Sequence, residues 1–133
     1  GTYKTFKTDP ALETGGIFLD LGQAGKFKIA RAGGNNKGFQ ELFYKLTKPY
    51  RRAIQTETLD DKISNDILVK TYAREVILGW EGVTDESGKD LTFTVEACEK
   101  LLKDLPDLFS EIRRAAEDAA NFRMIELRED SGN

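Results

Sequence analysis

The sequence contains no histidine and only one cysteine, Cys98. Without histidine the commonest general base and metal ligand are missing, so imidazole-based triads and zinc sites of the usual Cys/His kind are excluded. A single cysteine cannot form a disulfide within the chain, which fits a reducing compartment. Cys98 has no evident activator beside it in the sequence, so we expect it to be a small buried hydrophobe.

Long hydrophobic runs are also missing. A membrane-spanning helix needs roughly 20 apolar residues, and the runs here are far shorter. No basic-then-apolar leader opens the sequence, so we expect no secretion by that route and no membrane partner. A length of 133 residues suffices for one core. We predict one domain over residues 1–133, β-rich over 1–34 and mainly helical over 35–133.

The net charge of −3 is unevenly distributed. Residues 1–54 hold ten Lys/Arg and four Asp/Glu, whereas residues 55–133 hold ten Lys/Arg and nineteen Asp/Glu. One interpretation is two solvated faces of a single domain. The other is that the basic half of one copy meets the acidic half of the next, as in rings or filaments. Nucleic-acid binding is disfavoured, because the basic residues form neither an RNA-binding motif nor a helix-turn-helix pattern.

Alternating apolar and polar residues predict a β-hairpin over residues 16–31. The two strands are 17–21 and 26–31, and the connection 22–25 contains glycine. A weaker alternation predicts a further strand over residues 3–7.

Helical patterns follow the hairpin. Asn36 is a candidate cap for a helix that should stop or kink before Pro49, and a second piece should follow over residues 50–54. Residues 55–64 are polar and predict a loop. The next helix should be capped by Asn65 or Asp66.

The helix after this loop is expected to be the central buried one. Its apolar residues recur at spacings of three and four from Leu68 to Trp80, which predicts a helix as far as Trp80. Gly79 is suited to ending it. The indole of Trp80 is then interpreted as a plug in the core, in preference to a platform for a ligand.

A turn at residues 85–88 is predicted next, with Val83 and a short strand at 91–93 forming a second hairpin around it. Thr94 should then cap a helix that runs to Lys103.

The last predicted helix begins at Pro106, which suits the first turn of a helix. Apolar residues follow at alternating steps of three and four, which is coiled-coil spacing. This pattern indicates either a stripe that binds a partner helix or ordinary core packing, and the sequence leaves both open. Residues 128–133 are polar and are expected to fray. The candidate partner-binding stripe consists of Leu108, Ile112, Ala115, Ala119 and Phe122.

These elements predict an α+β fold, with an N-terminal β-hairpin or small sheet followed by a mostly helical bundle and a short second hairpin. No pair of carboxylates can be assigned to a shared cleft. The acidic turn at Asp85 fails the calcium-loop pattern, because glycine occupies its fourth position and not its sixth. We therefore predict no catalytic, cofactor-binding or metal-binding residues, and a small enzyme is the least favoured hypothesis.

One segment resembles a known family. Residues 67–73, followed by Gly79-Trp80-Glu81-Gly82-Val83 and the turn at 85–88, resemble the tail assembly chaperones of long-tailed bacteriophages. In that family an apolar helix runs into a Gly-Trp-x-Gly-Val segment, an Asp/Gly turn and a short Leu/Phe strand. A helix and a Leu-Pro-Asp-Leu-Phe-like start follow, and the resemblance covers residues 65–122. The residues carried over are structural: Trp80, Gly82, Gly88 and Pro106.

The resemblance implies a non-enzymatic protein that acts in the cytoplasm of the bacterial host. It would bind the long, mostly helical tape measure protein until tail tube subunits polymerise around it, and it would form homo-oligomers. Tail tube protein is a second implied partner. The alternative is a structural protein of the virion, in the head, neck or tail, that uses the same domain for subunit contacts.

Overall fold

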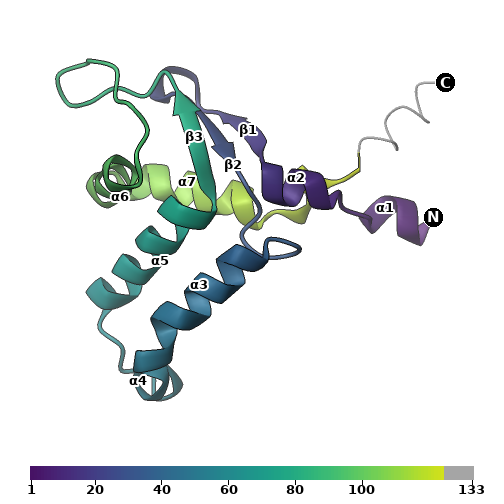
Figure 1. Cartoon of the computed structure of the whole chain (residues 1–133), viewed down its shortest axis with the longest axis horizontal. Helices are drawn as coiled ribbons and strands as arrows, with labels where there is room; N and C mark the ends of the chain where they lie inside the picture. Colours follow the sequence, from purple (N-terminus) through teal and green to yellow (C-terminus); the bar gives the residue numbers. More distant parts are fainter. Residues whose placement is uncertain (125–133) are drawn as a thin grey trace.

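The computed structural model describes residues 1–124, and within them it confirms the α+β class (Figure 1). Three short 3₁₀ turns, η1 (Gly22–Ala24), η2 (Lys48–Tyr50) and η3 (Ala119–Phe122), connect or end the main elements. The helices and strands are α1 (Thr2–Phe6), α2 (Pro10–Gly15), β1 (Ile17–Asp20), β2 (Lys26–Ile29), α3 (Lys37–Thr47), α4 (Arg51–Gln55), α5 (Asp61–Glu75), β3 (Ile77–Glu81), α6 (Val95–Asp104) and α7 (Pro106–Glu117).

The strands form one antiparallel sheet in the order β1-β2-β3. The hairpin predicted over residues 16–31 is confirmed, with Leu19 opposite Phe27. Phe27 and Ile29 of β2 are fully buried, whereas Lys26 and Lys28 between them face solvent. This alternation places the apolar face of β2 in the core, as a strand with one buried face requires.

The predicted end of the central helix is wrong. Helix α5 ends at Glu75, and the next residues form β3, which places Trp80 on a strand opposite Phe27 of β2. The same apolar residues satisfy a helical and an extended spacing, so the periodicity of a short apolar run does not distinguish the two. The start is also wrong, because Asp60 is the cap and accepts a hydrogen bond from the Lys62 N–H at 2.7 Å.

The N-terminal residues differ from the prediction as well. The strand expected over residues 3–7 is helix α1, so the segment 1–34 contains helices beside its two strands. Asp9 caps α2 by accepting from the Ala11 N–H at 2.9 Å, and Pro10 occupies the first helical position. Asp-Pro is therefore a helix start here, a combination that cap preferences favour.

The second hairpin is reduced to one bridge between Thr84 and Asp90. The predicted turn at 85–88 is confirmed, and Gly88 adopts φ +83°, which favours glycine. The strand expected over residues 91–93 does not form. Phe93 instead packs edge-on against Trp80, with the two ring centroids 4.9 Å apart.

The other predicted helix boundaries fit closely, except that the last helix ends at Glu117, before Ala119 and Phe122 of the predicted stripe. Helix α3 stops at Thr47 just before Pro49, and α4 follows the intervening turn. Thr94 caps α6 by accepting from the Ala97 N–H at 3.0 Å. Pro106 opens α7 as expected.

The core lies between the sheet and the helices α5, α6 and α7. Helices α3 and α5 lie side by side and reach away from the sheet, with α4 at their far end (Figure 1). We call this projecting part, residues 37–75, the arm. Tyr72 connects it to the core, because its ring packs edge-on against Phe39 of α3 and Phe109 of α7. The largest fully buried apolar side chains include Tyr72, Phe27, Phe122, Ile29, Ile77, Leu102 and Ile112.

Candidate functional site

Three of the four residues carried over from the resemblance lie around the end of β3. Trp80 is partly buried and donates its indole N–H to the Leu91 carbonyl at 2.7 Å. Gly82 ends the strand with φ +69°, and Gly88 lies in the turn beyond. Pro106 lies on a different element, at the start of α7. In this arrangement Trp80 packs against neighbouring residues, and Gly82 and Gly88 allow the chain to turn.

The candidate partner-binding stripe is used largely inside the chain. Ile112 and Phe122 are fully buried, and Leu108 and Ala115 are partly buried against the core. Asp118 leaves the helical conformation, so Ala119 and Phe122 lie on η3 and not on α7. The stripe is thus not one continuous free helix face, and its role in binding a partner stays a prediction.

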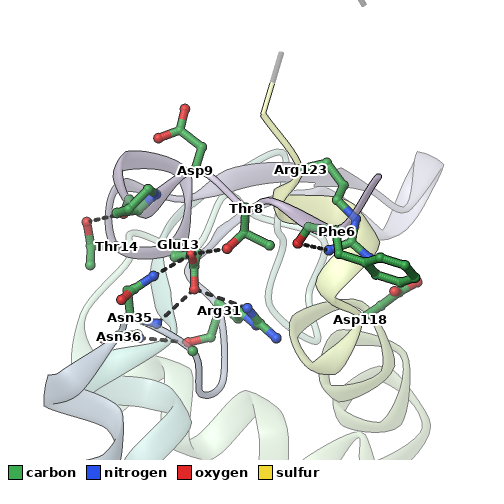
Figure 2. A network of polar contacts seen from close by, with 12 residues as sticks. Phe6, Thr8, Asp9, Glu13, Thr14, Arg31, Asn35, Asn36, Asp118 and Arg123 are labelled. Carbon is green, nitrogen blue, oxygen red and sulfur yellow. Dashed lines mark hydrogen bonds and ion pairs between the residues drawn. The ribbon is translucent and has the colours of Figure 1, made fainter. Parts of the chain in front are cut away.

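A buried carboxylate that the sequence did not reveal lies on α2. Glu13 is fully buried, and both of its oxygens accept hydrogen bonds (Figure 2). Oε1 accepts from the Thr8 hydroxyl at 2.7 Å and from the Asn35 side-chain amide at 2.8 Å. Oε2 accepts from the Asn35 backbone N–H at 2.8 Å and from the Arg31 guanidinium at 3.1 Å.

The ionised form of Glu13 is strongly favoured. Burial by itself raises the pKa of a carboxyl group, but the hydrogen bonds from Asn35, Thr8 and Arg31 outweigh it and lower the pKa from 4.5 to about 2. A carboxylate whose acceptor positions are all taken within its own chain anchors neighbouring segments. Glu13 therefore fastens α2 to the loop after β2.

That loop fits closely around Glu13. Gly34 has φ +52°, and a Cβ added there would lie 2.1 Å from Oε2 of Glu13, so only glycine fits. Asn36 is at the predicted cap position, but its side chain does not cap α3. Its amide donates to the carbonyls of Arg31 and Glu75, each at 2.9 Å, and so ties the loop to the end of α5.

The signals for this network were weak in the sequence. Glu13 has no distinctive pattern around it, and residues 32–36 have the glycine- and asparagine-rich composition of a flexible loop. An Asp-Pro start four residues before Glu13 shows that residue 13 is helical. Nothing local shows that this helix is covered by a loop some twenty residues further on.

The arm exposes apolar side chains. Tyr44 is 58% and Ile54 43% solvent-exposed, and Phe43 and Tyr50 are also exposed. Two hollows flank the arm. One, of about 310 Å³, includes Phe43 and Ile54. The other, which we call the α3–α5 groove, has a volume of about 600 Å³, and its apolar lining residues are Leu46, Pro49, Tyr50, Ile63 and Ile67.

The rim of the α3–α5 groove is basic. Lys45, Lys62, Lys70 and Lys103 line it together with one carboxylate, Asp66. Asp66 pairs with Lys103 at 2.8 Å and with Lys70 at 3.0 Å. These two hydrogen bonds, chiefly the one from Lys103, lower the pKa of Asp66. One carboxylate is thus shared between two lysines, which leaves the lining with a surplus of positive charge.

Residues 1–124 contain neither a metal-binding cluster nor a membrane-spanning helix. No group of three or more Cys, Asp or Glu residues in this part of the chain is placed to hold a metal ion. In the same residues, no helix has both the length and the apolar character needed to cross a membrane.

Cys98 is fully buried on α6, as expected. Burial, with a smaller effect from the charge of Glu99, raises the pKa of its thiol to about 12. Because the thiolate is the reactive form, we expect Cys98 to resist a thiol reagent such as DTNB in native buffer at pH 8 and to react at once in denaturant. Absorbance at 412 nm measures this, and fast labelling of the native protein would contradict the burial.

Taken together, the described residues form a small α+β domain with one core and a projecting arm. The sequence profile described as YdaY prophage protein matches residues 34–133, which is most of the chain. The chain belongs to this family and is a phage-associated protein. No curated protein and no solved structure matches it. The family description does not specify a tail assembly chaperone, and that role stays a prediction.

Proposed function

We propose that the chain is a non-enzymatic tail assembly chaperone that binds the tape measure protein in the bacterial cytoplasm and self-associates during tail assembly. The observation that supports this proposal is that the family resemblance and the prophage family match cover the same part of the chain. The resemblance to tail assembly chaperones covers residues 65–122, and this range lies inside the segment 34–133 that assigns the chain to a prophage family. A phage protein with that motif is most economically interpreted as an assembly factor.

The arm supports the proposal physically. A chaperone that coats a long helical protein needs exposed apolar surface, and the arm offers Tyr44 and Ile54 beside two hollows. The uneven charge of residues 1–54 and 55–133 is suited to contacts between successive copies.

Co-expression with the large tail gene product of the same phage tests the proposal. We expect the tagged chain to retain that product in a pull-down, whereas the tag alone does not. We also expect the large product to shift from inclusion bodies to the soluble fraction when the chain is present. Absence of both effects would count against the chaperone role.

The alternative is a structural protein of the virion, which the same small domain also suits. Mass spectrometry of purified particles separates the two, because a chaperone leaves before the particle is complete. Stoichiometric amounts of the chain in washed particles would favour the structural role.

A further inference from the structure

The α3–α5 groove combines an apolar floor with a basic rim. Its volume is about 600 Å³. Tyr50 on its wall is 37% exposed although it is aromatic. Exposed apolar surface bordered by charge is typical of a site that another molecule covers.

The charge of the rim indicates the charge of the molecule that covers the groove. Within residues 1–124, Lys45 and Lys62 form no ion pair with a carboxylate, and Lys70 and Lys103 share Asp66. The lining therefore has three more positive than negative charges. A covering surface with carboxylates beside its apolar groups would satisfy them, and a basic or neutral one would not.

Within residues 1–124, the exposed apolar side chains of α1, Phe18 and Leu105 in a second copy are a poor match. The exposed aromatic residues of α1 have no carboxylate in the same helix, and Phe18 lies beneath the ammonium groups of Lys26 and Lys28. Leu105 is exposed too and lies beside Asp104, but that carboxylate is already paired with Lys100, and the neighbouring Lys103 itself lines the groove. A copy that inserted Leu105 would bring its own lysine to a lysine rim.

We propose that the α3–α5 groove docks an amphipathic helix of a partner protein, in which Asp or Glu residues flank an apolar stripe. Such a helix places its apolar side chains along the groove, in the helix-in-groove mode of recognition. The lysines select its charge and speed its association. The inference rests on the proposed function in one respect: in a tail assembly chaperone this helix belongs to the tape measure protein.

Two synthetic peptides test the groove directly. Each has about 20 residues with leucine at the a and d positions of a heptad; one carries Glu at the flanking positions and the other Lys. Fluorescence anisotropy at physiological ionic strength measures their binding to the full chain. We expect the acidic peptide to bind at least about tenfold more tightly than the basic one.

Paired charge reversals locate the binding. Lys45→Glu with Lys62→Glu should weaken binding of the acidic peptide by at least about tenfold and strengthen that of the basic peptide. Lys37→Glu with Lys89→Glu changes the net charge equally at exposed positions outside the groove lining, and it should leave both affinities unchanged. Tyr50→Ser should weaken binding of the acidic peptide, because an apolar contact is lost.

Equal binding of both peptides, or unchanged binding by the Lys45/Lys62 variant, would overturn the proposal. So would a change in the sedimentation coefficient of that variant alone, without peptide, since a second copy would then occupy the groove. The peptides contain no phage sequence. A chain that keeps its preference for the acidic peptide but fails to retain the tape measure protein would therefore refute the proposed function and leave the groove assignment intact.

Discussion

Replacing Trp80 with alanine is expected to lower the free energy of unfolding by about 3 kcal/mol. The indole packs edge-on between two other aromatic rings, with its centroid 6.0 Å from that of Phe27 and 4.9 Å from that of Phe93. It also donates to the Leu91 carbonyl at 2.7 Å. Truncation opens a cavity under the end of β3 and leaves that carbonyl without its donor. The total free energy of unfolding of a small domain is only about 5–15 kcal/mol, so this loss is a large fraction of it.

Trp80→Phe separates the two contributions. It keeps a ring between Phe27 and Phe93 but removes the indole N–H, so the expected loss is about 1 kcal/mol, the usual net value of one hydrogen bond. Urea unfolding should be followed by circular dichroism at 222 nm, because both variants lack the only tryptophan. An alanine variant with the midpoint of the wild type would show that the ring contributes nothing to the core.

The hairpin at 16–31 was predictable because its information is local. Phe27 and Ile29 alternate with lysines, and the glycine-containing connection has hairpin length. The capped start of α6 and the proline start of α7 were predictable for the same reason. Each of these signals is read within a few neighbouring residues.

The segment from Val76 to Trp80 was not predictable in this way. Its apolar residues continue the helical spacing of α5, and only pairing with β2 makes the segment a strand. That pairing joins residues about fifty positions apart, and periodicity contains no information about it. The N-terminal helices were missed because residues 3–7 alternate weakly and the helix start at Asp9-Pro10 was not used.

In the candidate site, too, only features with local sequence signals could be predicted. The turn around Gly88 was predicted from local residues, whereas Trp80 was predicted at the end of a helix and lies on β3. The α3–α5 groove was not visible at all, because its lining comes from α3, η2, α5 and α6. Lys103 and Asp66, which meet at its rim, lie 37 positions apart and have ordinary surface character in the sequence.

Glu13→Gln is the second change with a large expected effect, about 2 kcal/mol at pH 7. Glutamine has the same shape but offers one acceptor oxygen where the carboxylate offers two. The Thr8 hydroxyl and the Asn35 side chain can reorient to accept from the new NH₂ group. The Arg31 guanidinium and the Asn35 backbone N–H cannot accept, so their hydrogen bonds lose the assistance of a negative charge.

The effect should depend on pH in a defined direction. The pKa of Glu13 is about 2 in the folded chain, below its usual value of 4.5, so the folded state favours the ionised form. The resulting stabilisation is fully present above about pH 4.5 and is lost as the pH falls toward 2. Urea unfolding at pH 7, 4 and 3 should therefore show the difference between wild type and Glu13→Gln shrinking with acidity. A difference that is constant over this range would mean that the ionisation of Glu13 does not cause the loss of stability, and the anchoring of α2 by its charge would then be refuted.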